Sequence, residues 1–129
     1  MDTLALAAGP GEARTTAQGH PRAIFQRAID RGNLLVAENT LREIGRVTLA
    51  EALQLTALIA VKDSRRHARV SARWLARWLE ERDQATIDEA PFVTACLVGL
   101  GGAGHEAAYA PLLDVADRAS RRPVSHGVA

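Results

Sequence analysis

Apolar residues recur every three to four positions along most of this chain, which is the period of an α-helix with one buried face. The pattern predicts about six helices, separated by short polar or glycine-containing stretches. Only the segment from Phe92 to Val98 is rich in the β-branched residues typical of a strand. We therefore expect an all-α fold: a compact bundle of five or six helices in antiparallel pairs joined by short turns.

Residues typical of helix ends mark where the first two predicted helices begin and end. Pro21 suits the first turn of a helix that continues to Arg31, and Gly32 ends it. Asn33 can cap the next helix, which should end near Gly45. The expected apolar stripes consist of Ile24, Phe25, Ala28 and Ile29 in the first helix and of Leu34, Ala37, Leu41 and Ile44 in the second.

A capping box begins the third predicted helix. Thr48 and Glu51 have the spacing at which a hydroxyl and a carboxylate each bond the other residue's backbone N–H group. The segment that follows, Leu49 to Val61, is apolar on nearly every side. A helix of this kind belongs at the centre of a bundle.

Two alternative signals can begin the fifth helix. Thr86 and Glu89 form a second capping box, whereas Asp88 as the cap would place Pro91 in the first turn, where proline is favoured. The helix should end in the glycine-rich turn at residues 99–104. Its expected buried residues are Phe92, Val93, Cys96, Leu97 and Leu100.

The sixth helix should run from about His105 to Ala119. Pro111 lies in its interior, where the ring removes a backbone donor, so we expect a kink or a break there. Residues 1–19 and 121–129 have no helical period and are expected to be flexible tails on a single helical domain, residues 20–120.

The fourth predicted helix, Asp63 to Arg82, is the most distinctive segment. At about 100° of rotation per residue, its arginines fall within an arc of about 120° and its apolar residues share the remainder. One face should pack against the bundle while the other meets anions or water. The arginine row consists of Arg65, Arg69, Arg73 and Arg77, and the apolar face includes Val70, Trp74 and Trp78.

The sequence leaves three interpretations of the arginine row open. It can be a solvated helix face, a surface that docks on an acidic protein partner, or a surface that binds nucleic-acid phosphates. Glu80, Glu81 and Asp83 follow the row and would repel a long polyanion. Lys62 is the only lysine among 16 basic residues, which indicates a coding bias toward arginine. Each arginine is therefore weaker evidence for a functional role.

Large aromatic side chains on the apolar side of a helix usually belong to the core, so this is the expectation for Trp74 and Trp78. If either is exposed, it would anchor an interface. Our leading hypothesis is a non-enzymatic protein-interaction module in which the four arginines contact a protein partner, with one tryptophan as the anchor. The alternative is an accessory nucleic-acid-binding protein that uses the same arginines on phosphates.

Composition restricts the classes of partner and the location that we expect. With a net charge of +1, the molecule as a whole should not attract nucleic acid or membranes electrostatically. The chain also contains no run of about 20 apolar residues that could span a bilayer. The single cysteine, Cys96, is compatible with a reducing compartment. We expect a cytoplasmic protein that could form a homodimer to cover leftover apolar surface.

The candidate catalytic and cofactor motifs lack the neighbouring residues that their chemistry requires. The glycines at positions 99, 101 and 104 match G-x-G-x-x-G, but the 25 residues that follow contain no second strand and no suitably placed acidic residue. His20, His67, His105 and His126 form no pair at ligand spacing. Cys96 lies on an apolar stripe, where a thiol is a poor nucleophile. We therefore expect no cofactor, no metal site and no enzymatic activity.

A resemblance to HEAT-type helical repeats concerns about half the chain. Thr48 to Glu81 resembles one such repeat, with an apolar first helix, Asp63 at the turn, and a second helix that carries Arg69, Val70, Ala72 and Leu75. Val98 to Ala116 resembles the junction into another. As a family, these repeats are protein-binding scaffolds, and some bind nucleic acid, so the resemblance implies a role in binding.

Overall fold

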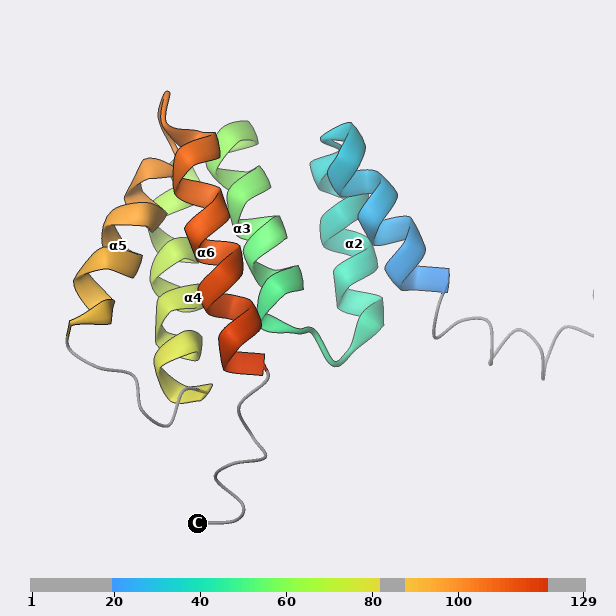
Figure 1. Cartoon of the computed structure of the whole chain (residues 1–129). Helices are drawn as coiled ribbons and strands as arrows, with labels where there is room; N and C mark the ends of the chain where they lie inside the picture. The colour runs from blue at the N-terminus through green and yellow to red at the C-terminus, as the bar shows by residue number, and fades with distance from the viewer. Residues whose placement is uncertain (1–19, 82–87, 121–129) are drawn as a thin grey trace, which may run out of the picture. The chain divides into compact units, whose positions relative to one another are not determined.

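The computed structural model describes residues 20–81 and 88–120, and every regular element in these ranges is a helix (Figure 1). The prediction of an all-α fold is confirmed. By its internal contacts the chain divides into two compact units, Met1–Arg46 and Val47–Ala129, and each is described by itself. The single helical domain over residues 20–120, with tails on either side, stays a prediction. Within the described ranges, we find no helix with the length and apolar character needed to cross a membrane.

The described part of the first unit contains two helices, residues 20–31 and α2 (Leu34–Ile44). Gly32 adopts a φ of 72°, the left-handed conformation that ends a helix without steric penalty. The Asn33 side chain then accepts a hydrogen bond of 3.2 Å from the backbone N–H of Val36. Both predicted helix ends at this turn are confirmed.

The described part of the second unit is a bundle of four α-helices, α3 (Leu49–Lys62), α4 (His67–Glu81), α5 (Glu89–Gly99) and α6 (His105–Ser120). Helix α3 contacts α4 and α6, and α5 contacts the same two helices from the other side (Figure 1). The core is drawn from all four helices. Its large members are Leu49, Leu53, Trp74, Trp78, Val93, Leu97, Leu100, Leu112 and Val115.

Helix α3 begins as the sequence predicts. The Thr48 hydroxyl accepts a hydrogen bond of 3.0 Å from the Glu51 N–H, and the Glu51 carboxylate accepts one of 2.9 Å from the Thr48 N–H. Six residues of the helix are buried, in keeping with its expected place at the centre: Leu49, Leu53, Thr56, Ala57, Ile59 and Ala60.

Helix α4 begins later than predicted. Residues Ser64–Arg66 form a short 3-10 turn, η1, and the α-helix starts at His67. The Asp63 side chain does not cap α4, because its carboxylate pairs with the Arg66 guanidinium at 2.8 Å. The Asp63 backbone N–H donates to the Ile59 carbonyl at the end of α3. The prediction of one helix from Asp63 onward is therefore corrected.

Helix α5 confirms one expectation and corrects another. The segment Phe92 to Val98 is helical, as the predicted fifth helix requires, so the glycine-rich turn follows a helix and not the strand of a dinucleotide-binding site. Phe92 is 54% exposed rather than buried. Asp88 occupies the position before the helix but makes no side-chain cap, and Thr86 lies outside the described residues.

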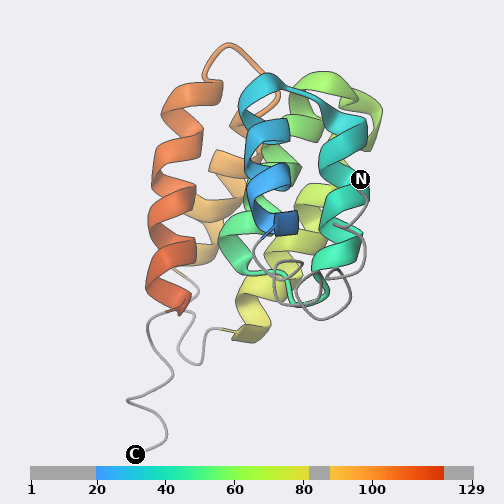
Figure 2. The same cartoon turned by 90° about the vertical axis from the view of Figure 1, so that its right-hand side faces the viewer.

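Helix α6 is continuous through Pro111, so the expected break does not occur. A proline in a helix leaves the carbonyl four residues earlier without its usual donor. That carbonyl belongs to Ala107, which is exposed, so water can satisfy it. Between α5 and α6, the glycine-rich turn lies at the same end of the bundle as the turn from α3 to α4 (Figure 2).

Candidate interaction site on helices α4 and α5

Helix α4 places both tryptophans in the core. Trp74 is 3% exposed and Trp78 is fully buried. The Trp74 indole N–H donates a hydrogen bond of 2.9 Å to the Leu49 carbonyl, which joins α4 to the first turn of α3. A surface anchor needs an exposed side chain, so the suggestion that Trp74 or Trp78 anchors a partner is corrected.

The arginine row divides into one residue bonded within the second unit and three without a partner in the described part of the chain. Arg77 is half-buried, and its guanidinium donates to the Val47 carbonyl at 2.5 Å and to the Glu81 carboxylate at 2.6 Å. This arginine fixes the start of the second unit to α4, so it is not available as a contact residue. Arg65, Arg69 and Arg73 are exposed, and none has a hydrogen bond or ion pair with a residue in 20–81 or 88–120.

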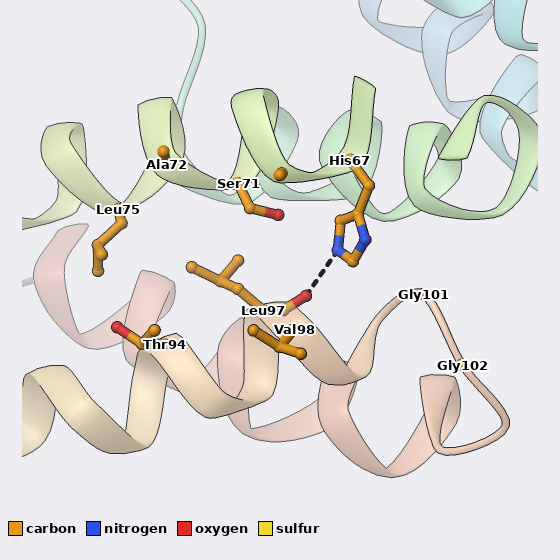
Figure 3. Close-up of a pocket in the computed structure, with 10 residues that line it drawn as sticks. His67, Ser71, Ala72, Leu75, Thr94, Leu97, Val98, Gly101 and Gly102 are labelled. Carbon is orange, nitrogen blue, oxygen red and sulfur yellow. Dashed lines mark hydrogen bonds between the residues drawn. The ribbon is translucent and has the colours of Figure 1, made fainter. Parts of the chain in front are cut away.

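An apolar groove with a volume of about 560 Å³ lies between α4, α5 and the turn after α5 (Figure 3). Its volume is within the range of ligand-binding clefts, roughly 300–1,000 Å³. Small and aliphatic side chains form most of its surface. The lining residues are His67, Ala68, Ser71, Ala72 and Leu75 from α4, Thr94, Leu97 and Val98 from α5, and Gly101 and Gly102 from the turn.

Helix α4 contributes two polar side chains to the groove, His67 next to the turn and Ser71 one helical turn further along (Figure 3). The His67 ring lies 2.8 Å through Nε2 from the Leu97 carbonyl, a contact that requires a proton on Nε2 because a carbonyl oxygen only accepts (Figure 3). Ser71 is 8% exposed, and its hydroxyl oxygen has no hydrogen-bond partner within the described residues. The groove is thus mostly apolar, with polar groups from His67, Ser71 and Thr94 (Figure 3).

Gly101 permits the close approach of the turn to α4. A Cβ atom at this position would lie 2.7 Å from Nδ1 of His67, closer than nonbonded atoms normally come, whereas a Cβ at Gly102 would meet nothing within 4 Å. The glycine-rich pattern thus identifies a tight helix–turn contact. The sequence contained this signal but not its partner, because His67 lies more than 30 residues away.

Helices α4 and α5 expose large apolar side chains. Leu79 on α4 is 41% exposed and Val98 on α5 is 69% exposed. After Glu89, α5 contains no charged residue, although half of its side chains meet solvent. Exposed apolar residues that adjoin a groove are typical of surfaces that bind another molecule.

The remaining histidine and the cysteine have structural environments. His105 contacts the Leu100 carbonyl through Nδ1 at 2.7 Å and stacks on Tyr109, so both described histidines of the second unit bond carbonyls near the end of α5. Cys96 is buried, and burial raises the pKa of its thiol. Among the described residues, no three histidine, cysteine, aspartate or glutamate side chains are grouped to hold a metal ion.

We expect the second unit to lose stability at alkaline pH. Burial is the main reason why the pKa values of the Cys96 thiol and the Tyr109 hydroxyl are raised in the folded protein. The unfolded chain therefore releases these protons at a lower pH than the folded protein. The stabilisation that the two protonated groups contribute is complete below their unfolded pKa values, of which the lower is about 8.5, and is lost as pH rises through the folded values. Urea unfolding between neutral pH and about pH 11 measures the decline.

Variants separate the two groups in this pH series. Cys96→Ala should remove the earlier part of the decline and Tyr109→Phe the later part. A free energy of unfolding that stays level above the unfolded cysteine pKa in the wild-type protein would contradict the prediction.

Comparisons of the chain with protein-family models, with curated proteins and with solved structures found no match. The candidate site therefore rests on the geometry of α4 and α5.

Proposed function

We propose that this protein is a non-enzymatic interaction module that binds a protein partner through α4. The observation that carries the proposal is the combination of three exposed arginines that have no partner among residues 20–81 and 88–120, Arg65, Arg69 and Arg73, with an apolar groove along the same helix. Interfaces of moderate affinity commonly join an apolar centre to a charged rim. Here the groove would supply the centre and the arginines the rim.

The partner surface should be acidic with apolar side chains beside it. Guanidinium groups form forked hydrogen bonds with carboxylates, and the attraction raises the rate of encounter at low salt. Leu79 and Val98 offer the apolar contact that we first expected from the tryptophans. The resemblance to a HEAT-type scaffold and a cytoplasmic location belong to the same proposal.

Nucleic acid is the second candidate, because the same arginines suit phosphates. Three phosphate contacts predict that affinity falls with about the 2.7th power of salt concentration, or roughly 40-fold between 50 and 200 mM. Glu80 and Glu81 lie at the end of the same helix, and Glu80 is exposed, so a duplex that follows α4 would meet repulsion. This repulsion favours the protein partner.

Two measurements test the proposal. Fluorescence anisotropy of a labelled DNA duplex at 50 and 200 mM salt should show no tight binding. Affinity capture from a lysate of cells that express the protein should retain proteins that the double variant Arg69→Glu/Arg73→Glu fails to retain.

A matched control distinguishes the α4 site from a general effect of charge. Arg27 and Arg31 are also exposed and four residues apart on a helix, but they belong to the first unit. Their double charge reversal should leave capture unchanged. Tight DNA binding that collapses at 200 mM salt, or capture that ignores the α4 charges, would refute the proposal.

A further inference from the structure

The outward face of α4 carries charges of both signs, arranged by position along the helix. Arg69 and Arg73 lie in its first half and Glu80 lies near its end. All three are exposed, and none has a hydrogen bond or ion pair with a described residue. A second copy of the helix running in the opposite direction would therefore present acidic charge to basic charge at both ends.

We propose that the partner of α4 is a second copy of this chain, and that the two α4 helices pack antiparallel about a twofold axis. The inference rests on the proposed function, because it names the partner for the same surface. Twofold dimers are the commonest oligomers, and their interfaces are self-complementary. Helix α4 satisfies that requirement by charge and by shape.

The charges define a register. In an antiparallel pair related by a twofold axis, the numbers of any two residues that face each other add up to the same value. Placing Arg69 opposite Glu80 of the second copy sets this sum at 149, and symmetry repeats the pair at the other end. Arg73 then lies opposite Ala76, a small residue that leaves the guanidinium room to reach Glu80.

The apolar residues give the same register independently. The α4 residues that line the groove extend from His67 to Leu75, so the groove is centred near residue 71. In the register set by the charges, Leu79 of the second copy lies level with residue 70. The exposed leucine of each copy therefore meets the groove of the other between Ala68 and Ala72, whose small side chains leave space for it.

The angular positions on α4 agree with this arrangement. At about 100° per residue, Ala68, Ala72 and Leu79 lie within about 40° of one another. Arg69 and Glu80 lie together about 100° further round the helix. A twofold axis perpendicular to both helices places the apolar side of each α4 against the apolar side of the other copy. It likewise places the charged side of each α4 against the charged side of the other.

The expected association is weak. Helix α4 is about 22 Å long, and one helix face buries less than the roughly 800 Å² per partner of a standard interface. We therefore expect dissociation in the micromolar range. Analytical ultracentrifugation of the full chain from about 2 to 200 µM covers that range and reports the dissociation constant.

Charge reversal followed by mixing tests the register. Arg69→Glu/Arg73→Glu and Glu80→Arg should each weaken self-association at least 10-fold, because each places like charges opposite one another. An equimolar mixture of the two should restore association as a heterodimer, because every facing pair again has opposite signs. Leu79→Ser should weaken the wild-type dimer without affecting charge, and Arg27→Glu/Arg31→Glu should dimerise as the wild type does.

The outcomes separate this inference from the function on which it rests. A wild-type chain that is monomeric at 200 µM, or a mixture that fails to restore association, overturns the inference. In either case the proposed function still stands if capture of a different protein depends on Arg69 and Arg73. Circular dichroism and urea unfolding of each variant show that the exposed substitutions leave the fold intact.

Discussion

Replacing Trp78 by alanine is expected to lower the free energy of unfolding of the second unit by about 3–5 kcal/mol. Trp78 is fully buried and belongs to a core to which α3, α4, α5 and α6 all contribute. Removing the indole leaves a large cavity that close-packed neighbours cannot fill completely. Because small domains have only about 5–15 kcal/mol of stability in total, the variant should be close to unfolding at room temperature.

Urea unfolding followed by circular dichroism measures this loss. Leu79→Ala is the matched control, because Leu79 follows Trp78 on the same helix but is 41% exposed. Its substitution should change the free energy of unfolding by about 1 kcal/mol or less. Equal losses in the two variants would show that α4 does not face the core as described.

Replacing Gly101 by alanine is expected to lower the free energy of unfolding by about 1–3 kcal/mol, the usual range for overpacking. The new methyl group would lie 2.7 Å from the His67 ring. The ring can move away only by giving up its hydrogen bond to the Leu97 carbonyl, so either the clash or the lost bond remains. Backbone strain is not the reason, since only Gly32 and Gly45 among the described glycines have positive φ.

Gly102→Ala is the control for this prediction, because a Cβ at that position meets nothing within 4 Å. It should leave the unfolding midpoint in urea nearly unchanged. Combining Gly101→Ala with His67→Ala should add much less than the sum of the two single losses, because both act on one contact. Additive losses would contradict the assigned contact.

Helix ends that depend on neighbouring residues could be predicted from the sequence. The Thr48 and Glu51 capping box and the Asn33 cap each join groups three residues apart, so residue spacing alone identifies them. The predicted start of the fourth helix at Asp63 was wrong, because residues 64–66 form a 3-10 turn and the Asp63 carboxylate pairs with Arg66. Two local bonds were possible for one side chain, and the pattern does not rank them.

The candidate site could be predicted only in part, because it depends on contacts between distant residues. The arginine row was visible, but the bond that removes Arg77 from it joins residues 30 positions apart, as does the His67 contact that closes the groove. The exposure of Phe92 was missed for a different reason. Helix α5 is apolar around its whole circumference, so its pattern does not show which side faces solvent.

The bond between Arg77 and Val47 has a consequence for how the chain enters the bundle. Val47 is the first residue of the second unit, and its carbonyl is held by α4. The same guanidinium also holds the Glu81 carboxylate at the end of α4. One side chain therefore joins the last turn of α4 to the backbone directly before the capping box of α3.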